Sequence, residues 1–68
     1  MSELIFHVED APEGGFVARA LGHSLFTEGA TLDELRANIR EAVACHFEEG
    51  SGPRVIRLHC VREETLAP

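Results

Sequence analysis

Residues 31–50 are the one stretch of this chain with a clear helical period, and the rest of the sequence is arranged around it. Apolar side chains and one histidine recur there three and four residues apart, which places them on one face of a helix. These residues are Leu32, Leu35, Ile39, Ala42, Val43 and His46, with Phe47 beside them. The opposite positions carry Asp33, Asn38, Glu41, Cys45 and Glu48. The pattern predicts one amphipathic helix that covers an apolar surface formed by the remaining residues.

The predicted helix has recognisable start and stop signals. Thr31 is a good N-cap residue, and Glu34 three positions later completes a capping box. Asp33 adds negative charge to the first turn, where the helix dipole favours it. Gly50 can adopt positive φ, so the sequence predicts that the helix ends there.

Four shorter segments alternate between apolar and polar residues and predict β-strands. They lie at residues 3–9, 16–21, 24–27 and 54–61. A turn that contains Pro12 and the pair Gly14-Gly15 joins the first two strands into a hairpin. Pro53 lies between the helix and the last strand, at a point that a helix cannot cross.

The order β-β-β-α-β predicts an α+β fold, with a three-stranded antiparallel meander and one helical crossover. The crossover returns the fourth strand parallel to the first or the third strand, and placing it beside the first gives the order 3-2-1-4. A chain of 68 residues predicts a single domain, 1–68, with a marginal core. Because one helix covers only one sheet face, we expect self-association into a dimer or a larger oligomer.

The charge of the chain restricts its partners. Twelve acidic residues stand against six arginines, which gives a formal net charge of −6. This balance disfavours direct binding to nucleic acid and favours a basic partner. The N-terminal residues have neither the cationic stretch nor the apolar run of a signal peptide. No segment approaches the roughly 20 apolar residues that cross a bilayer, so we expect a cytoplasmic protein without membrane contact.

Neither a metal site nor a catalytic site is predicted. Cys45 and Cys60 are not spaced as a disulfide framework; one bridge between them stays open, although reduced thiols are favoured. The pairs Cys45-His46 and His59-Cys60 offer zinc ligands, but in each pair the two side chains point in different directions. The serines lack a nucleophile signature, and the carboxylates lie mostly in turns and on the outer helix face. We therefore expect no catalytic residue, no metal, no cofactor and no enzymatic activity.

One sheet face gathers the candidate site residues. If Phe6 and Leu58 face the helix, the alternate positions on their strands lie on the open face. The basic residues at those positions are His7, Arg57 and His59, and Arg19 joins them if Phe16 and Ala18 also face the helix. Two interpretations stay open for them. They form either a contact patch for an anionic ligand or a partner chain, or a solvated or dimer-buried face whose arginines pair with Glu3, Glu9 or Glu63.

Three segments of the chain resemble a known family. They are the run EGGFVARA at 13–20, the run FTEGATLDEL at 26–35 and the run NIREA at 38–42. In this order and spacing they are similar to the HicB-type antitoxin domain, over about Leu4 to Val61. The resemblance implies a truncated ribonuclease H-like fold that lacks the nuclease carboxylates of that fold.

The same resemblance implies a function. Family members bind and neutralise a small basic mRNA-cleaving toxin, usually by occluding its catalytic histidine. Many carry a C-terminal DNA-binding extension, which this chain lacks up to Pro68, and a Pro-Gly-Cys loop where it has Gly22-His23-Ser24. The chain is therefore similar to a stand-alone variant. We expect an antitoxin-like protein-binding module or, alternatively, a structural or regulatory oligomer that binds a small ligand or another protein.

Overall fold

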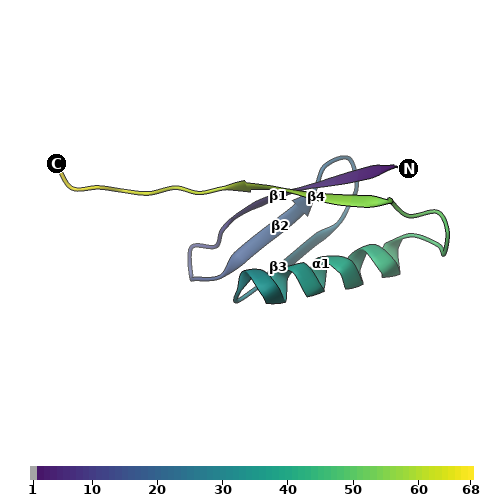
Figure 1. The fold of residues 1–68 in the computed structure, drawn as a ribbon. Helices are drawn as coiled ribbons and strands as arrows, with labels where there is room; N and C mark the ends of the chain where they lie inside the picture. Colours follow the sequence, from purple (N-terminus) through teal and green to yellow (C-terminus); the bar gives the residue numbers. More distant parts are fainter. Residues whose placement is uncertain (1) are drawn as a thin grey trace.

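The computed structural model describes residues 2–68, which form one mixed sheet and one helix. The elements are β1 (Glu3–Asp10), β2 (Phe16–Ala20), β3 (Phe26–Gly29), α1 (Leu32–His46) and β4 (Val55–Val61). Figure 1 shows the sheet above α1, with the strands in the order β3-β2-β1-β4. The predicted α+β class and the predicted order 3-2-1-4 are both confirmed.

The sheet contains two kinds of strand pairing. β1 runs antiparallel to β2, with Phe6 opposite Ala20, and β2 runs antiparallel to β3. β4 returns parallel to β1 after the helix, with Leu58 beside Phe6. The parallel pairing follows from the crossover, because α1 carries the chain from the β3 edge to the opposite edge, where β4 runs in the same direction as β1 and β3.

The N-terminus of α1 is capped as the sequence predicts. The Thr31 hydroxyl accepts a hydrogen bond from the Glu34 backbone N–H at 3.1 Å. The Glu34 carboxylate in turn accepts the Ala30 N–H at 3.0 Å, one residue further back than the usual capping box. Gly29 allows close packing here, because a Cβ on it would lie 2.6 Å from the Leu35 backbone nitrogen.

The predicted end of the helix is wrong. α1 ends at His46, with Phe47 as an extended C-cap residue at φ −102° and ψ 145°. Leaving the helical conformation lets the Phe47 ring pack against the core and edge-on against His23, with a centroid distance of 5.3 Å. Gly50 does adopt positive φ, at 83°, but in the turn that follows. Tertiary packing of an aromatic ring therefore ends the helix before the glycine.

The predicted third strand is displaced. It was expected at 24–27, whereas β3 spans Phe26–Gly29. The Ala20 N–H donates to the Leu25 carbonyl at 3.0 Å, so the residues between them form the connection. β2 accordingly ends at Ala20, and the strand that follows starts two residues later than its sequence suggests.

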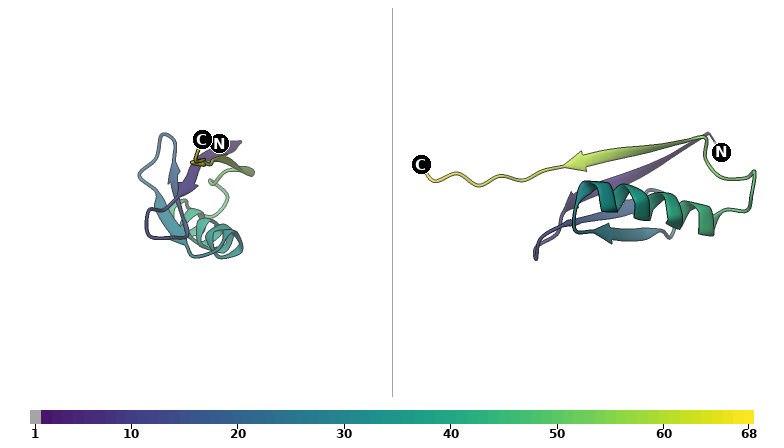
Figure 2. Two further views of the ribbon diagram at one scale, coloured as in Figure 1. Left: turned by 90° about the vertical axis from the view of Figure 1, so that its left-hand side faces the viewer. Right: turned by 60° about the horizontal axis from the view of Figure 1, so that its bottom comes forward.

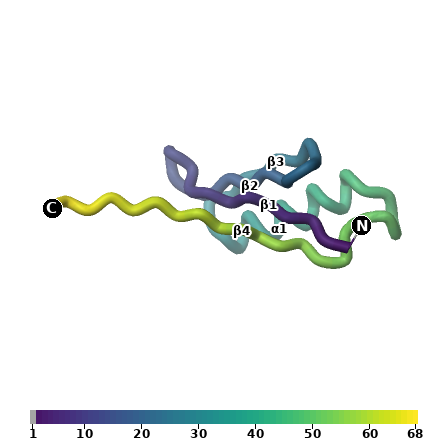
Figure 3. The backbone as a smooth tube through the Cα atoms, turned by 90° about the horizontal axis from the view of Figure 1, so that it is seen from above, coloured from purple at the N-terminus to yellow at the C-terminus, as the bar shows by residue number. Residues whose placement is uncertain are grey.

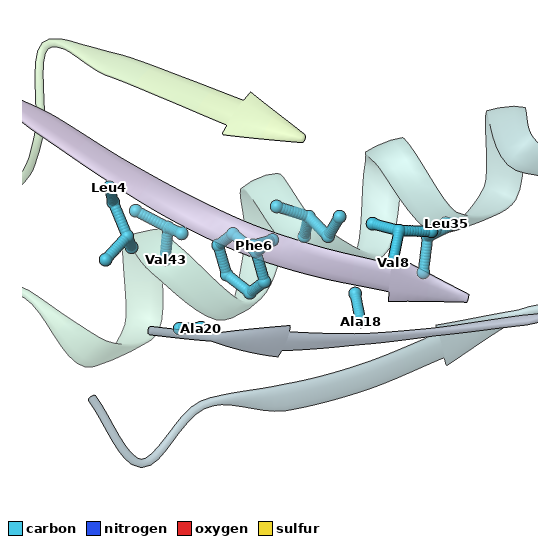
Figure 4. Close-up of a cluster of buried hydrophobic side chains, with 8 residues drawn as sticks. Leu4, Phe6, Val8, Ala18, Ala20, Leu35 and Val43 are labelled. Carbon is cyan, nitrogen blue, oxygen red and sulfur yellow. The ribbon is translucent and has the colours of Figure 1, made fainter. Parts of the chain in front are cut away.

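The core lies between α1 and the lower face of the sheet. It comprises Leu4, Phe6 and Val8 from β1, Ala18 and Ala20 from β2, and Leu35, Ile39 and Val43 from α1. Figure 4 shows these side chains meeting between the helix and the strands. His46 is exposed although it continues the helical period, because the helix ends there, and Cys45 and Cys60 are exposed free thiols. Within residues 2–68, no helix has the length and apolar character needed to cross a membrane.

Candidate functional site

The candidate site is the sheet face that α1 leaves uncovered, which we call the open face. Figure 2 shows α1 packed on one side of the sheet, and Figure 3 views the molecule from the other side. Residues that alternate with the buried positions occupy this face. They are Glu3, Ile5, His7 and Glu9 of β1, Val17 and Arg19 of β2, Phe26 and Glu28 of β3, and Val55, Arg57, His59 and Val61 of β4.

The strand register brings three of the predicted site residues into one row. Arg19 lies opposite His7, and His7 lies beside His59. The two imidazole rings stack with centroids 6.1 Å apart and an interplanar angle of 13°. Arg57 stands one position away in the next row, beside Ile5. All four predicted side chains therefore share the open face, although they come from three strands and span residues 7–59 of the sequence.

Carboxylates of the same face lie close to two of these basic groups. The Arg57 Nη2 donates to the Glu3 Oε2 at 2.9 Å, and the His7 Nε2 lies 3.7 Å from the Glu9 Oε2. The hydrogen bond from Arg57 lowers the pKa of Glu3, and the same bond raises the pKa of Arg57. Arg57 is therefore paired with Glu3, one of the carboxylates named as its possible partners, and is less available to an anionic ligand. Contact of this face with a partner chain stays a prediction.

The open face also carries apolar residues that sequence reasoning did not single out. Phe26 is 58% exposed, Val55 52% and Val61 42%, while Leu21 at the rim is 55% exposed. The strand predicted at 24–27 already contains Phe26, but its register against β2 was not predicted, so the face of Phe26 was not assigned. Its register position opposite Arg19 puts it on this face, and only the alternation within a correctly placed hairpin could have revealed that.

A metal site would require a cluster of ligating side chains among the described residues. No group of three or more His, Cys, Asp or Glu side chains within residues 2–68 is arranged to hold a metal ion. The exposed thiols of Cys45 and Cys60 lie on α1 and β4 respectively. What the face offers is a surface of exposed apolar side chains mixed with paired charges.

Fold and surface together define a small α+β module with one covered and one open sheet face. The chain belongs to the UPF0150 family. It is 50% identical to a UPF0150 protein of Archaeoglobus fulgidus over 52 residues, which cover 76% of this chain and 77% of that protein. It is 35% identical to a UPF0150 protein of Thermotoga maritima over 65 residues, covering 96% and 91% of the two chains. No family model and no solved structure matches the chain.

Proposed function

We propose that this protein is a binding module of antitoxin type, which captures and neutralises a small basic mRNA-cleaving protein through the open face of its sheet. The observation that carries the proposal is the exposed apolar side chain of Phe26, accompanied by Leu21, Val55 and Val61. Phe26 lies at the β3 edge of the open face, and Val55 and Val61 lie at the two ends of β4 at the other edge, so the apolar groups frame the basic residues between them. An aromatic residue and arginines among them are typical of protein interfaces.

Charge supports a basic partner. The chain has a formal net charge of −6. On the open face Glu3 and Glu9 lie beside Arg57 and His7, whereas Glu28 has no ion pair within residues 2–68. Glu9 and Glu28 lie in one row, on either side of Val17. Complementary charge raises the rate at which a basic protein encounters such a surface and disfavours acidic competitors.

The resemblance to the HicB-type domain adds support for the class of partner. Its motifs fall at positions that determine the fold: Gly15 and Gly29 pack closely against the neighbouring backbone, and Thr31 caps α1. The resemblance thus supports a shared scaffold, and the toxin-binding role comes from the family and not from the geometry alone.

The alternative is a self-assembling protein with a structural or regulatory role. One observation favours it, namely that β4 lies at an edge of the sheet and is seven residues long. A long edge strand offers unpaired backbone groups to another chain. The two functions are separable, because one uses the open face and the other uses the edge.

Co-purification tests the proposal. The tagged chain, expressed in its native host, is expected to elute with a small basic protein in stoichiometric amount and to suppress the RNA cleavage of that protein. Phe26→Asp should abolish capture, whereas Ala37→Asp on the outer side of α1 should leave capture intact. Recovery of the wild-type chain alone, or a captured protein without RNA-cleaving activity, would contradict the antitoxin role.

A further inference from the structure

The two edges of the sheet are unequal. β3 forms one edge; it has four residues and ends at Gly29, which is buried against α1. β4 forms the other edge; it has seven residues and within residues 2–68 it pairs only with β1. Natural proteins usually keep their edge strands short, or protect them with bulges, prolines or inward-pointing charged side chains. The interior of β4 contains no proline, and its one charged residue, Arg57, pairs with Glu3 on the open face, so the backbone of its outer edge is suited to pairing with another strand.

The C-terminal segment, residues 62–68, continues the line of β4 beyond the sheet. Figures 1 and 3 show it leaving the body of the molecule as an extended chain. The molecule measures 51 Å along its long axis and 19 × 18 Å across. Every residue of the segment is exposed, and Leu66 is 79% exposed, the highest value among the large apolar residues within 2–68. An extended, solvated segment that carries an apolar side chain is suited to adding a strand to a sheet.

A strand added at the edge of β4 would project side chains toward α1, and the helix side of β4 has space for them. Ile56 and Leu58 pack against the core but stay partly exposed, and Cys60 is exposed. A hollow of ≈ 190 Å³ lies between α1 and β4, lined by Arg36, Ile39, Arg40, Ile56 and Leu58. A separate hollow of ≈ 250 Å³ lies at the end of β4, lined by apolar residues such as Val8 and Leu32 and by the charged residues Glu9, Asp10 and Arg62. We call the first hollow the trough; Ile56 and Leu58 form its sheet side, and Arg36 and Arg40 are among the residues on its helix side.

We propose that two copies of this chain pair through β4, so that residues 62–67 of each copy run antiparallel along the outer edge of β4 of the other. The partner is a second copy because the chain itself supplies both halves of the contact, an open edge and an extended segment in line with it. The twofold axis would stand perpendicular to the sheet and would join the two four-stranded sheets into one. The inference is independent of toxin binding.

Side-chain complementarity selects the register. Residues opposite each other in an antiparallel pair share a face, so Leu66 must meet a residue on the helix side of β4. An axis at Val61 places Leu66 opposite Ile56 of the second copy and Glu63 opposite His59. Because the axis is twofold, each of these pairings occurs twice in the dimer. An axis at Arg62 would instead oppose two arginines at the centre, and an axis at Cys60 would place Glu64 against Ile56.

The same register places Glu64 beside the arginines of the trough. With the axis at Val61, Glu64 lies opposite Leu58 of the second copy, on the helix side. Arg36 and Arg40 line the hollow over Leu58. Arg36 already donates to Asp33 at 2.8 Å, whereas Arg40 makes no ion pair within residues 2–68. Glu64 of one copy is therefore expected to pair with Arg40 of the other.

Sedimentation of the full chain tests the assembly. The wild-type chain is expected to form a dimer, and Leu66→Asp should weaken it on the order of a hundredfold, because an apolar contact is lost twice. Phe26→Asp is the matched control; it also places a charge at an exposed apolar position, but on the open face, and should leave the dimer unchanged. A wild-type monomer at all concentrations would overturn the proposal, and so would a dimer that Phe26→Asp breaks and Leu66→Asp leaves intact.

Charge reversal and crosslinking test the register. Glu64→Arg and Arg40→Glu should each weaken the dimer, and the double variant should recover most of the loss. In a chain with Cys45→Ser and Cys60→Ser, Val61→Cys should give an oxidised dimer, because two Val61 residues would face each other at the axis. Arg62→Cys in the same chain should crosslink far less. Crosslinking through native Cys60 but not through Val61→Cys would contradict this register.

Discussion

The two faces of the sheet are built from the same strands and are suited to different tasks. On β1, the side chains of Leu4, Phe6 and Val8 are 0–2% exposed and pack against α1. The intervening residues Ile5 and His7 are partly exposed on the open face, where paired charges mix with apolar groups. Successive side chains of a strand point to opposite faces. Alternate residues of β1 can therefore be changed to affect either the stability of the core or binding at the open face.

The largest expected effect lies on the covered face. Leu35→Ala removes a side chain that is fully buried in the core and should cost about 2–5 kcal/mol, enough to unfold most of a marginal domain. Phe26→Ala on the open face should change stability by no more than about 0.5 kcal/mol. Urea unfolding followed by circular dichroism measures both. Equal losses of unfolding free energy in the two variants would contradict the assignment of one face to the core and the other to solvent.

A smaller loss is expected where β3 meets α1. Gly29→Ala should cost about 1–3 kcal/mol, since the new Cβ would lie 2.6 Å from the Leu35 nitrogen and force the helix away. Gly14→Ala provides a contrast, because no atom lies within 4 Å of its added Cβ and only the positive φ of 103° opposes it. Thermal unfolding compares the two. A Gly29→Ala variant as stable as the wild type would show that α1 does not press on this point.

The N-cap contributes less again. Thr31→Ala should cost about 1 kcal/mol, because the Glu34 N–H loses its hydroxyl acceptor while the core stays unchanged. Thr31→Ser, which keeps the hydroxyl, should retain most of the stability. If both variants lost the same amount, the effect would come from packing of the threonine methyl group and not from the cap.

The smallest effect is expected from the ion pair on the open face. Arg57 lowers the pKa of Glu3 from its ordinary value of 4.5, mainly through a hydrogen bond. A carboxylate with a lowered pKa stabilises the fold above its ordinary pKa, and this contribution disappears as the pH falls through the lowered value. The wild type should therefore melt slightly above Glu3→Gln at pH 7, and the gap should close in acid. A gap that widened in acid would contradict the assignment.

Much of the fold follows from the sequence because local and tertiary preferences agree there. The capped start of α1 at Thr31 depends on side chains three residues apart, and the apolar period of residues 35–43 fixes the face that is buried. The strand order follows from a right-handed helical crossover that places the fourth strand beside the first. These features needed no knowledge of distant contacts.

The remaining features depend on contacts that periodicity does not reveal. The end of α1 is set by Phe47 packing beside His23, which lies 24 positions earlier in the chain, and not by the glycine at position 50. The start of β3 depends on how many residues the preceding turn absorbs. In the candidate site, alternation placed His7, Arg19, Arg57 and His59 together, but the pairing of Arg57 with Glu3 joins residues 54 positions apart.

A binding isotherm with the protein captured by the wild-type chain tests most directly whether the open face is the surface that binds the partner. It compares the wild type with Phe26→Asp, after equal melting temperatures have shown that both are folded. Phe26→Asp is expected to melt like the wild type and to lose binding. Full binding by that variant would contradict the assignment of the open face as the surface that meets the partner.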